Sequence, residues 1–385
     1  KKYKVFNLIE IRETFFNKLT ILKKENQYIL LSNGFQEWST QPDYFSIKNI
    51  VYFSLAFCKD LKKVGIYGNP EILEEIKKYK VPEIYFFEID KEKFKFIKEY
   101  QLKSGSKNIY FYDNLTRFLK ENKIKFDVFI ITSSLPMTMR ENYFLTEDFF
   151  REIKDFTETI SIVLPGTYDY LGEILLNLHS SIYKTGKKYF VNELLVFTYP
   201  MIIIFSNSEL KLKKMLLTDK EFFNESYLNF VTDENKKSKY LEKILNTPSH
   251  INTISNQFSL YTSIAFYFSQ FSQKTGKILI KFFSFLYKLK DFLPIIFLLI
   301  FLILLLPSFS PYSTIIFTNG FSSFTFETIF IYLFQIYFGF IYGFISGIIG
   351  IFMAGLSSGS LISILRIHSK KTLFYSEILH FLFYA

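Results

Sequence analysis

Apolar and polar residues alternate along three short segments near the N-terminus, at Leu8–Arg12, Leu19–Lys23 and Tyr28–Leu31. Strict alternation over four or more residues is typical of strands that bury one face. Asn33-Gly34 follows the third segment and is a strong hairpin turn signal. The pattern therefore predicts a small β unit over residues 1–44.

From residue 45 to residue 210, short runs of β-branched and aromatic residues alternate with helical patterns. Expected strands are Lys63–Gly68, Glu83–Ile89, Asn108–Tyr112, Asp127–Thr132, Thr159–Leu164, Val191–Phe197 and Met201–Phe205. This alternation predicts a doubly wound, mostly parallel sheet. Only Thr198-Tyr199-Pro200 separates the last two strands. Because a parallel crossover needs a dozen or more residues, we expect that pair to be antiparallel.

The chain from residue 292 onward is apolar in a different way. Three long stretches, Phe292–Leu306, Ile315–Phe338 and Ile341–Leu365, carry a single charged residue, Glu327. Apolar runs of this length predict transmembrane helices. We therefore expect a helical linker or interfacial region over residues 211–291 and a transmembrane region over 292–385, in a chain that is a piece of a longer protein.

Basic residues flank this region on both sides and predict its topology. Lys277, Lys281, Lys288 and Lys290 precede the first stretch, and Arg366, Lys370 and Lys371 follow the third. Since both flanks should be cytoplasmic, the first stretch, about 22 Å long as a helix, is expected to enter the roughly 30 Å core without crossing it. The other two would form a hairpin near Gly339. Three plain spans are the alternative.

Composition narrows the function classes. The net charge is +10, but the lysines are dispersed, which favours a role at a membrane surface over nucleic-acid binding. The single Cys58 excludes a disulfide framework. Four scattered histidines and no Cys/His pair at ligand spacing argue against a metal site.

Candidate chemistry lies at the predicted carboxyl ends of the strands, where open α/β sheets bind ligands. Glu88 follows the second strand, the position from which such folds hold the hydroxyls of a nucleoside ribose; a solvated acid is the alternative. The turn Gly65–Gly68 would let a ligand approach the backbone, or is only a turn. Asp113 would accept a hydrogen bond from adenine, unless Asp113 or Asn114 simply caps the next helix.

The order of these features resembles a polyamine aminopropyltransferase (spermidine synthase-like) domain, a Rossmann-like seven-stranded sheet of the S-adenosylmethionine-dependent transferase type. It is most similar to bacterial membrane proteins in which that domain is fused to transmembrane segments. The stretches that carry the resemblance are Asn26–Gln36, Gln41-Pro42-Asp43, Gly68, Glu88-Ile89-Asp90, Asp113, Asp127–Pro136 and the tail from Gly320 to Ser360.

The resemblance implies binding of decarboxylated S-adenosylmethionine, with Glu88 on the ribose, Asp113 on the adenine side and Gly68 beside the aminopropyl chain. An amine of a di- or polyamine would attack the carbon beside the sulfonium. The acid that should hold this amine falls on Leu135, and Asp43 and Glu141 are the candidate substitutes. A Tyr-His-Glu-like patch falls on Ser46-Ile47-Lys48, and Pro70 and Glu71 replace small residues of the glycine turn.

Aminopropyl transfer is therefore expected to be weak or lost, in a multi-pass protein of the bacterial inner membrane whose α/β domain is cytoplasmic. The alternative function is an inactive nucleoside-binding or interaction module coupled to a transporter-like membrane bundle, in which Glu327 would face the protein interior. Expected partners are the lipid bilayer and a polyamine, with no nucleic acid and no metal. Small-residue faces at Gly339, Gly343, Gly347, Gly355 and Gly359 would allow helices to associate into oligomers.

Overall fold

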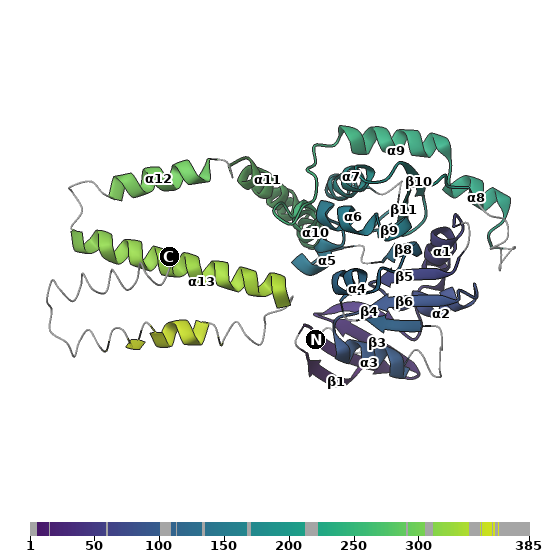
Figure 1. Cartoon of the computed structure of the whole chain (residues 1–385), viewed down its shortest axis with the longest axis horizontal. Helices are drawn as coiled ribbons and strands as arrows, with labels where there is room; N and C mark the ends of the chain where they lie inside the picture. The colour runs from purple at the N-terminus through teal and green to yellow at the C-terminus, as the bar shows by residue number, and fades with distance from the viewer. Residues whose placement is uncertain are drawn as a thin grey trace. The chain divides into compact units, whose positions relative to one another are not determined.

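A computed structural model describes residues 6–361 except 15, 59–60, 101–108, 113, 133–134, 168–170, 212–221, 290–291, 305–310, 339–346, 348, 356 and 359–360. Contacts divide the chain into two units, Lys1–Phe301 and Leu302–Ala385. The first unit contains both sheets and the candidate site (Figure 1).

A four-stranded antiparallel sheet forms the N-terminal part of the first unit, in the order β1-β2-β3-β4. Its strands are β1 Asn7–Glu13, β2 Lys18–Lys24, β3 Gln27–Ser32 and β4 Phe35–Ser39. The turn between β3 and β4 is the Asn33-Gly34 pair, with φ of 53° and 87° respectively. The predicted β unit is thus confirmed.

The second sheet has seven strands in the order β10-β11-β9-β8-β5-β6-β7. Its strands are β5 Lys63–Tyr67, β6 Glu83–Phe87, β7 Ile109–Tyr112, β8 Phe126–Ile131, β9 Thr157–Leu164, β10 Asn192–Val196 and β11 Met201–Ser206. Five strands run parallel, while β11 pairs antiparallel with both β9 and β10. The prediction of a doubly wound sheet ending in an antiparallel pair is confirmed.

Two apolar clusters cover the two faces of this sheet, and successive residues of each strand alternate between them. Val64 and Ile66 of β5 join the cluster formed with helices α1, α2 and α8, whereas Tyr67 joins the cluster formed with α4, α6, α7 and α9 (Figure 1). The helices of the first unit are α1 Tyr44–Leu55, α2 Ile72–Lys77, α3 Lys91–Tyr100, α4 Leu115–Asn122, α5 Met139–Tyr143, α6 Glu147–Ile153, α7 Glu173–Lys187, α8 Glu225–Val231, α9 Glu234–Asn246, α10 Phe258–Ser269 and α11 Gln273–Leu289.

Gly65 lies where β5 crosses the aromatic side of the core. A Cβ atom at this position would stand 2.3 Å from Cδ2 of Phe129, whose ring is fully buried. Because overpacking a dense core typically costs about 1–3 kcal/mol, Gly65→Ala is expected to lower the free energy of unfolding by that amount in urea titrations. Gly172→Ala is the control, since no atom lies within 4 Å of its added Cβ. Equal losses in both variants would contradict the packing argument.

Helix α13 (Pro311–Phe338) corrects the expectation of a transmembrane helix at Ile315–Phe338, whereas the first stretch, which contains α12 (Leu293–Leu304), is already expected not to cross. The 12 described residues of α12 span about 18 Å, less than the thickness of a bilayer core. With 28 residues, α13 is long enough, but serines, threonines, Asn319, Glu327 and Gln335 interrupt its apolar sequence. No helix among the described residues combines the length and apolar content needed for a span. Most of the third predicted stretch, Ile341–Leu365, lies outside the described residues.

Candidate functional site

Glu88 and Gly68 lie side by side at the carboxyl edge of the parallel strands. They directly follow Phe87 and Tyr67, which are paired between β6 and β5. Gly68 has φ of 110°, a conformation that favours glycine. The two residues that the sequence assigns to a nucleoside therefore meet at one edge of the sheet.

The Glu88 side chain is buried, with 10% of its surface exposed, and both carboxylate oxygens have partners. Oε1 accepts a hydrogen bond from the backbone N–H of Asp90 at 3.0 Å, and Oε2 lies 2.8 Å from Nζ of Lys93. The alternative of a solvated strand-end acid is wrong. Glu88 instead belongs to an internal ion pair.

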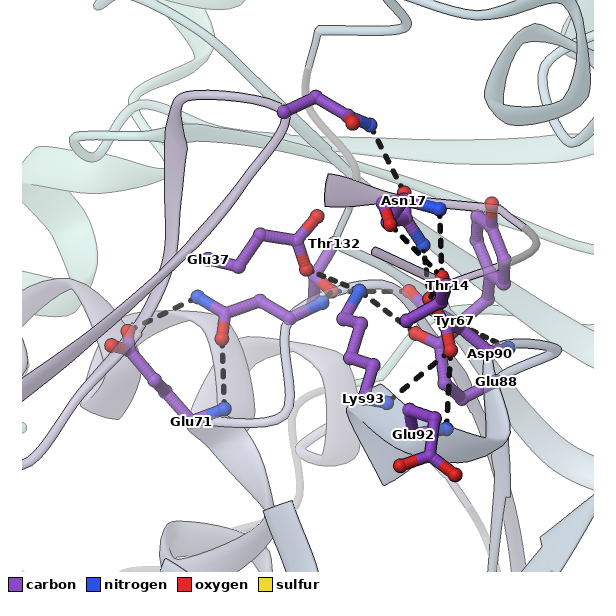
Figure 2. Close-up of polar contacts among 12 residues, drawn as sticks. Thr14, Asn17, Glu37, Tyr67, Glu71, Glu88, Asp90, Glu92, Lys93 and Thr132 are labelled. Carbon is purple, nitrogen blue, oxygen red and sulfur yellow. Dashed lines mark hydrogen bonds and ion pairs between the residues drawn. The ribbon is translucent and has the colours of Figure 1, made fainter. Parts of the chain in front are cut away.

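Lys93 supplies the cation of this pair from the first turn of α3. Its side chain is 8% exposed, and Nζ contacts carboxylates of both Glu88 and Glu37, which comes from β4 (Figure 2). Burial works to lower the pKa of Lys93, but the charges and hydrogen bonds of Glu37 and Glu88 outweigh it and raise that pKa. Lys93 is therefore a fixed positive charge inside the candidate site.

The same charges act on Glu88. Burial works to raise the pKa of Glu88, but the positive charges of Lys93 and Arg140, with the hydrogen bonds from Lys93 and the Asp90 backbone, hold it below its ordinary value. Glu88 is ionised at neutral pH and its charge is already balanced from within the protein.

Asp90 connects the site to the N-terminal sheet. Its Oδ2 accepts hydrogen bonds from Oγ1 of Thr14 at 2.6 Å and Nδ2 of Asn17 at 2.7 Å (Figure 2). Its Oδ1 accepts from the backbone N–H groups of Glu92 and Lys93 and so caps α3. One buried carboxylate thereby fixes the turn that carries Glu88 and the helix that carries Lys93.

Hydrogen bonds tie the residues that follow Gly68 to β4 and β8. Glu71 accepts a hydrogen bond from the Ser39 backbone N–H at 2.7 Å and another from Nδ2 of Asn69 at 3.1 Å. Thr132, at the end of β8, accepts from the Asn69 backbone N–H and donates to the Tyr67 carbonyl at 3.0 Å. Burial raises the pKa of Glu71, although its hydrogen bonds oppose the shift. Glu71 therefore places a carboxylate where the resemblance implies a small residue of the glycine turn.

Of the two candidate substitute acids, Glu141 is the one whose pKa is affected by the charges of this cluster. The charges of Glu37 and Lys93 act on Glu141, whose pKa burial raises. Its carboxylate, however, accepts from the Met137 and Thr138 backbone N–H groups and forms a capping box with Thr138. The other candidate, Asp43, is the N-cap of α1 and accepts from the backbone of Phe45 and Ser46 and from Oγ of Ser46.

Leu135, Ile47 and Ser46, three further predicted positions, contribute no charge. Leu135 is half-buried against the apolar cluster, Ile47 is buried, and Oγ of Ser46 also donates to the Tyr199 carbonyl at 2.9 Å. Asp113 lies outside the described residues, while Asn114 caps α4 by accepting from the Arg117 backbone N–H. The cap that the alternative assigned to Asp113 or Asn114 is thus Asn114.

A cleft of about 370 Å³ opens on the other side of Glu71, between the end of β4 and helices α1 and α2. Its lining includes Trp38, Tyr44, Ile47 and three glutamates, Glu71, Glu74 and Glu75, against one lysine, Lys78. Lys78 pairs with Glu75 at 2.5 Å. Across the described residues, no group of three or more His, Cys, Asp or Glu side chains could hold a metal ion.

Sequence reasoning missed Glu37 and Lys93. A signal for Lys93 does exist: a lysine in the first turn of a helix faces the positive end of the helix dipole, where a cation is unfavourable without a nearby anion. No comparable signal marks Glu37, because its contact depends on how the small sheet packs against α3.

The strand order defines a doubly wound α/β domain in which β5 and β6 are neighbouring parallel strands. Residues 47–216 match the family model described as the spermine/spermidine synthase domain. These 170 residues are thus similar to a spermine/spermidine synthase domain, and this chain spans less than half of the length of the first relative described below.

Relatives are distant. Polyamine aminopropyltransferase 2 of Aquifex aeolicus (strain VF5) is 24% identical over 208 residues, which are 51% of this chain and 40% of that protein. The polyamine aminopropyltransferase of Leptospira biflexa is 24% identical over 213 residues, 52% of this chain and 75% of that one. A spermidine synthase solved in complex with the transition state analogue AdoDATO has a TM-score of 0.50 at 16% identity, covering 61% of this chain and 88% of that one, and supports the fold.

Proposed function

We propose that this domain is an aminopropyltransferase-like module in which transfer from decarboxylated S-adenosylmethionine to a polyamine is weak or lost. The observation that carries the proposal is the buried ion pair between Lys93 and Glu88. An ammonium group beside Glu88 occupies the carboxylate that would hold a ribose. It also places a like charge near a cationic sulfonium donor and a cationic amine acceptor, which disfavours both.

The acceptor side supports the same proposal. A polyamine carries its charges at neutral pH and needs carboxylates in order to leave water, and Leu135 and Ile47 supply none. Removal of a positioned acid or base typically costs about 10²–10⁴-fold in rate. Glu141, the substitute on which the charges of the cluster act, is engaged by its own backbone.

The test is turnover by the purified full chain with decarboxylated S-adenosylmethionine and putrescine or spermidine, followed by chromatography of the polyamine products. We expect no product above that of Glu88→Gln, the matched control. Turnover on the order of 1–10 per second, ordinary for enzymes, would overturn the proposal and direct attention to Asp43 and Glu141 as amine-holding acids.

A second candidate is an inactive nucleoside-binding or interaction module, favoured by the adjacent positions of Gly68 and Glu88. Calorimetric titration separates the two candidates. Binding of decarboxylated or ordinary S-adenosylmethionine without turnover supports the second, and Glu88→Gln should then abolish binding.

Attachment to a bacterial inner membrane, with this domain on the cytoplasmic side, stays a proposal. It is supported by α12, a helix of apolar residues in which Ile295, Leu298 and Leu299 are each more than half exposed. Exposed apolar surface of this kind calls for a covering partner.

A further inference from the structure

Helix α11 packs only one of its faces against the rest of the first unit. Gly276 is buried against α10, where an added Cβ would stand 2.5 Å from Cβ of Ser269. Phe283 stacks on Tyr261 with ring centroids 4.8 Å apart, and the ring of Tyr287 lies 3.9 Å from that of His250. Since positions 276, 283 and 287 fall on one side of a helix, this side anchors α11.

The rest of the α11 surface divides into two adjoining stripes. The lysine stripe comprises Lys274, Lys277, Lys281 and Lys288, all exposed. The apolar stripe comprises Ile278, Phe282, Phe285 and Leu286, which are 55%, 50%, 58% and 40% exposed. Spacings of three, four and seven residues keep each stripe on one side of the helix.

Charge in this segment is of one sign. No Asp or Glu occurs between residues 272 and 289. Within the part of the chain that the structure describes, Lys277 pairs with one acid, the exposed Glu173, 3.6 Å away. Exposed pairs of this kind contribute little in water. The lysine stripe is therefore available to an anionic partner.

The apolar surface extends beyond α11. Phe268 and Phe271 precede it with 44% and 70% exposure, and the apolar helix α12 follows it. An aromatic and aliphatic patch of this kind on a soluble surface marks an interaction site. The flanking lysines indicate that the partner at this site is negatively charged.

We propose that α11 lies in the plane of an anionic lipid surface, with Phe282 and Phe285 in the acyl boundary and the lysine stripe among the headgroups. Helices with a wide apolar face and lysines along its border bind interfaces in this way, and long lysine stems can reach outward from a partly inserted helix. An acidic protein partner would pair with the lysines but would leave the apolar stripe exposed to water. The surface requires no ligand at Glu88, so it is independent of the proposed function.

Flotation of the purified full chain with vesicles tests the proposal. Binding to vesicles containing about one third phosphatidylglycerol should exceed binding to pure phosphatidylcholine and should fall with salt. At roughly fivefold per lysine, replacing the four stripe lysines by glutamine should remove a preference on the order of 10²-fold or more. The matched control replaces Lys236, Lys237, Lys239 and Lys243 of α9, which also contains Glu234 and Glu242, and should bind like the parent.

Insertion is read out separately. Phe285→Trp introduces a fluorophore at an exposed position, whereas the native Trp38 is buried. Its emission should shift to the blue on anionic vesicles and be quenched by brominated acyl chains, and Phe282→Ser should reduce the shift. Equal binding by the α11 and α9 lysine variants overturns the proposal. So does self-association that the α11 variant abolishes without any change in flotation, which would make a second copy the partner.

Discussion

Lys93→Met is expected to lower the free energy of unfolding by about 3–5 kcal/mol, the usual cost of removing one partner from a buried ion pair. The Lys93 side chain is 8% exposed and lies between Glu88, 10% exposed, and Glu37, 25% exposed. Methionine fills a similar volume, so the loss reports on charge and not on a cavity. Urea titration at pH 7 measures it.

The pH dependence of this loss provides a second signature. Without Lys93, burial acts on Glu88 unopposed by its nearest cation, so its pKa in the folded state should rise above the unfolded value. Such a group contributes stability that is present below the unfolded pKa and is lost as pH rises through the folded pKa. The difference between the parent and Lys93→Met should therefore begin to shrink as pH falls through this raised pKa, above the ordinary value of about 4.5, and should shrink further below that value as Glu88 of the parent takes up its proton.

Lys95→Met is the matched control, two residues further along α3. Lys95 is 66% exposed and pairs with Glu92 on the surface, so its replacement should cost less than about 1 kcal/mol. Adding Glu37→Gln and Glu88→Gln to Lys93→Met should recover much of the stability, because no buried charge then remains unpaired. A loss for Lys93→Met as small as that for Lys95→Met would show that the network is open to water.

Both sheets could be predicted from the sequence because each strand is marked by residues within it or next to it. Alternation within the N-terminal strands, the alternation of later strands with helices and the short link Thr198–Pro200 predict strand direction without any knowledge of packing. Glu88 and Gly68 could be placed for the same reason, since a strand end defines the edge of the sheet.

The Lys93 network was not visible in the same way. The position of Lys93 in the first turn of α3 is a weak signal, because Lys91 lies in the same turn and the sequence does not tell which of the two has a nearby anion. Its burial comes from β4, whose Glu37 is far away in sequence, and from Asp90, which joins β1 and β2 to α3 through Thr14 and Asn17. Such pairings depend on how two sheets pack and leave no periodicity.

The expectation of membrane spans failed for a related reason. Aromatic residues made Ile315–Phe338 look uniformly apolar, yet polar residues recur through all of α13. An apolar run shows that a segment avoids water. It does not distinguish crossing a bilayer from lying on one or from packing against another protein surface.

Acidification from pH 6.5 to pH 4 is expected to remove about 3 kcal/mol of stability through His179. This histidine of α7 is fully buried; Nε2 lies 2.8 Å from the Pro165 carbonyl and Nδ1 2.9 Å from the Tyr240 hydroxyl. Because a carbonyl only accepts, Nε2 carries the proton and Nδ1 accepts from Tyr240. Burial lowers the pKa of His179 from 6.5 to about 4, although the hydrogen bond to Pro165 opposes the shift.

The direction of this stability change follows from which state of the chain takes up the proton. Between pH 6.5 and 4 the unfolded chain binds the proton that the folded chain excludes, so the stability contributed by neutral His179 is complete above pH 6.5 and is lost as pH falls to 4. Each pKa unit corresponds to about 1.4 kcal/mol. The raised pKa values of Glu71 and Glu141 act in the opposite direction over part of this window. The pH dependence of the parent protein's free energy of unfolding therefore reports only the sum of these effects.

His179→Gln isolates the contribution of the imidazole. A glutamine amide is neutral throughout and can donate to Pro165 and accept from Tyr240, so the variant should lose some stability at pH 7 but show a flatter decline toward pH 4. The difference between the two proteins, measured by urea titration at half-unit steps of pH, should change by about 3 kcal/mol across the window. Parallel curves would mean that His179 is protonated in the folded protein at no cost, which would require water or a carboxylate to reach Nδ1 past Tyr240.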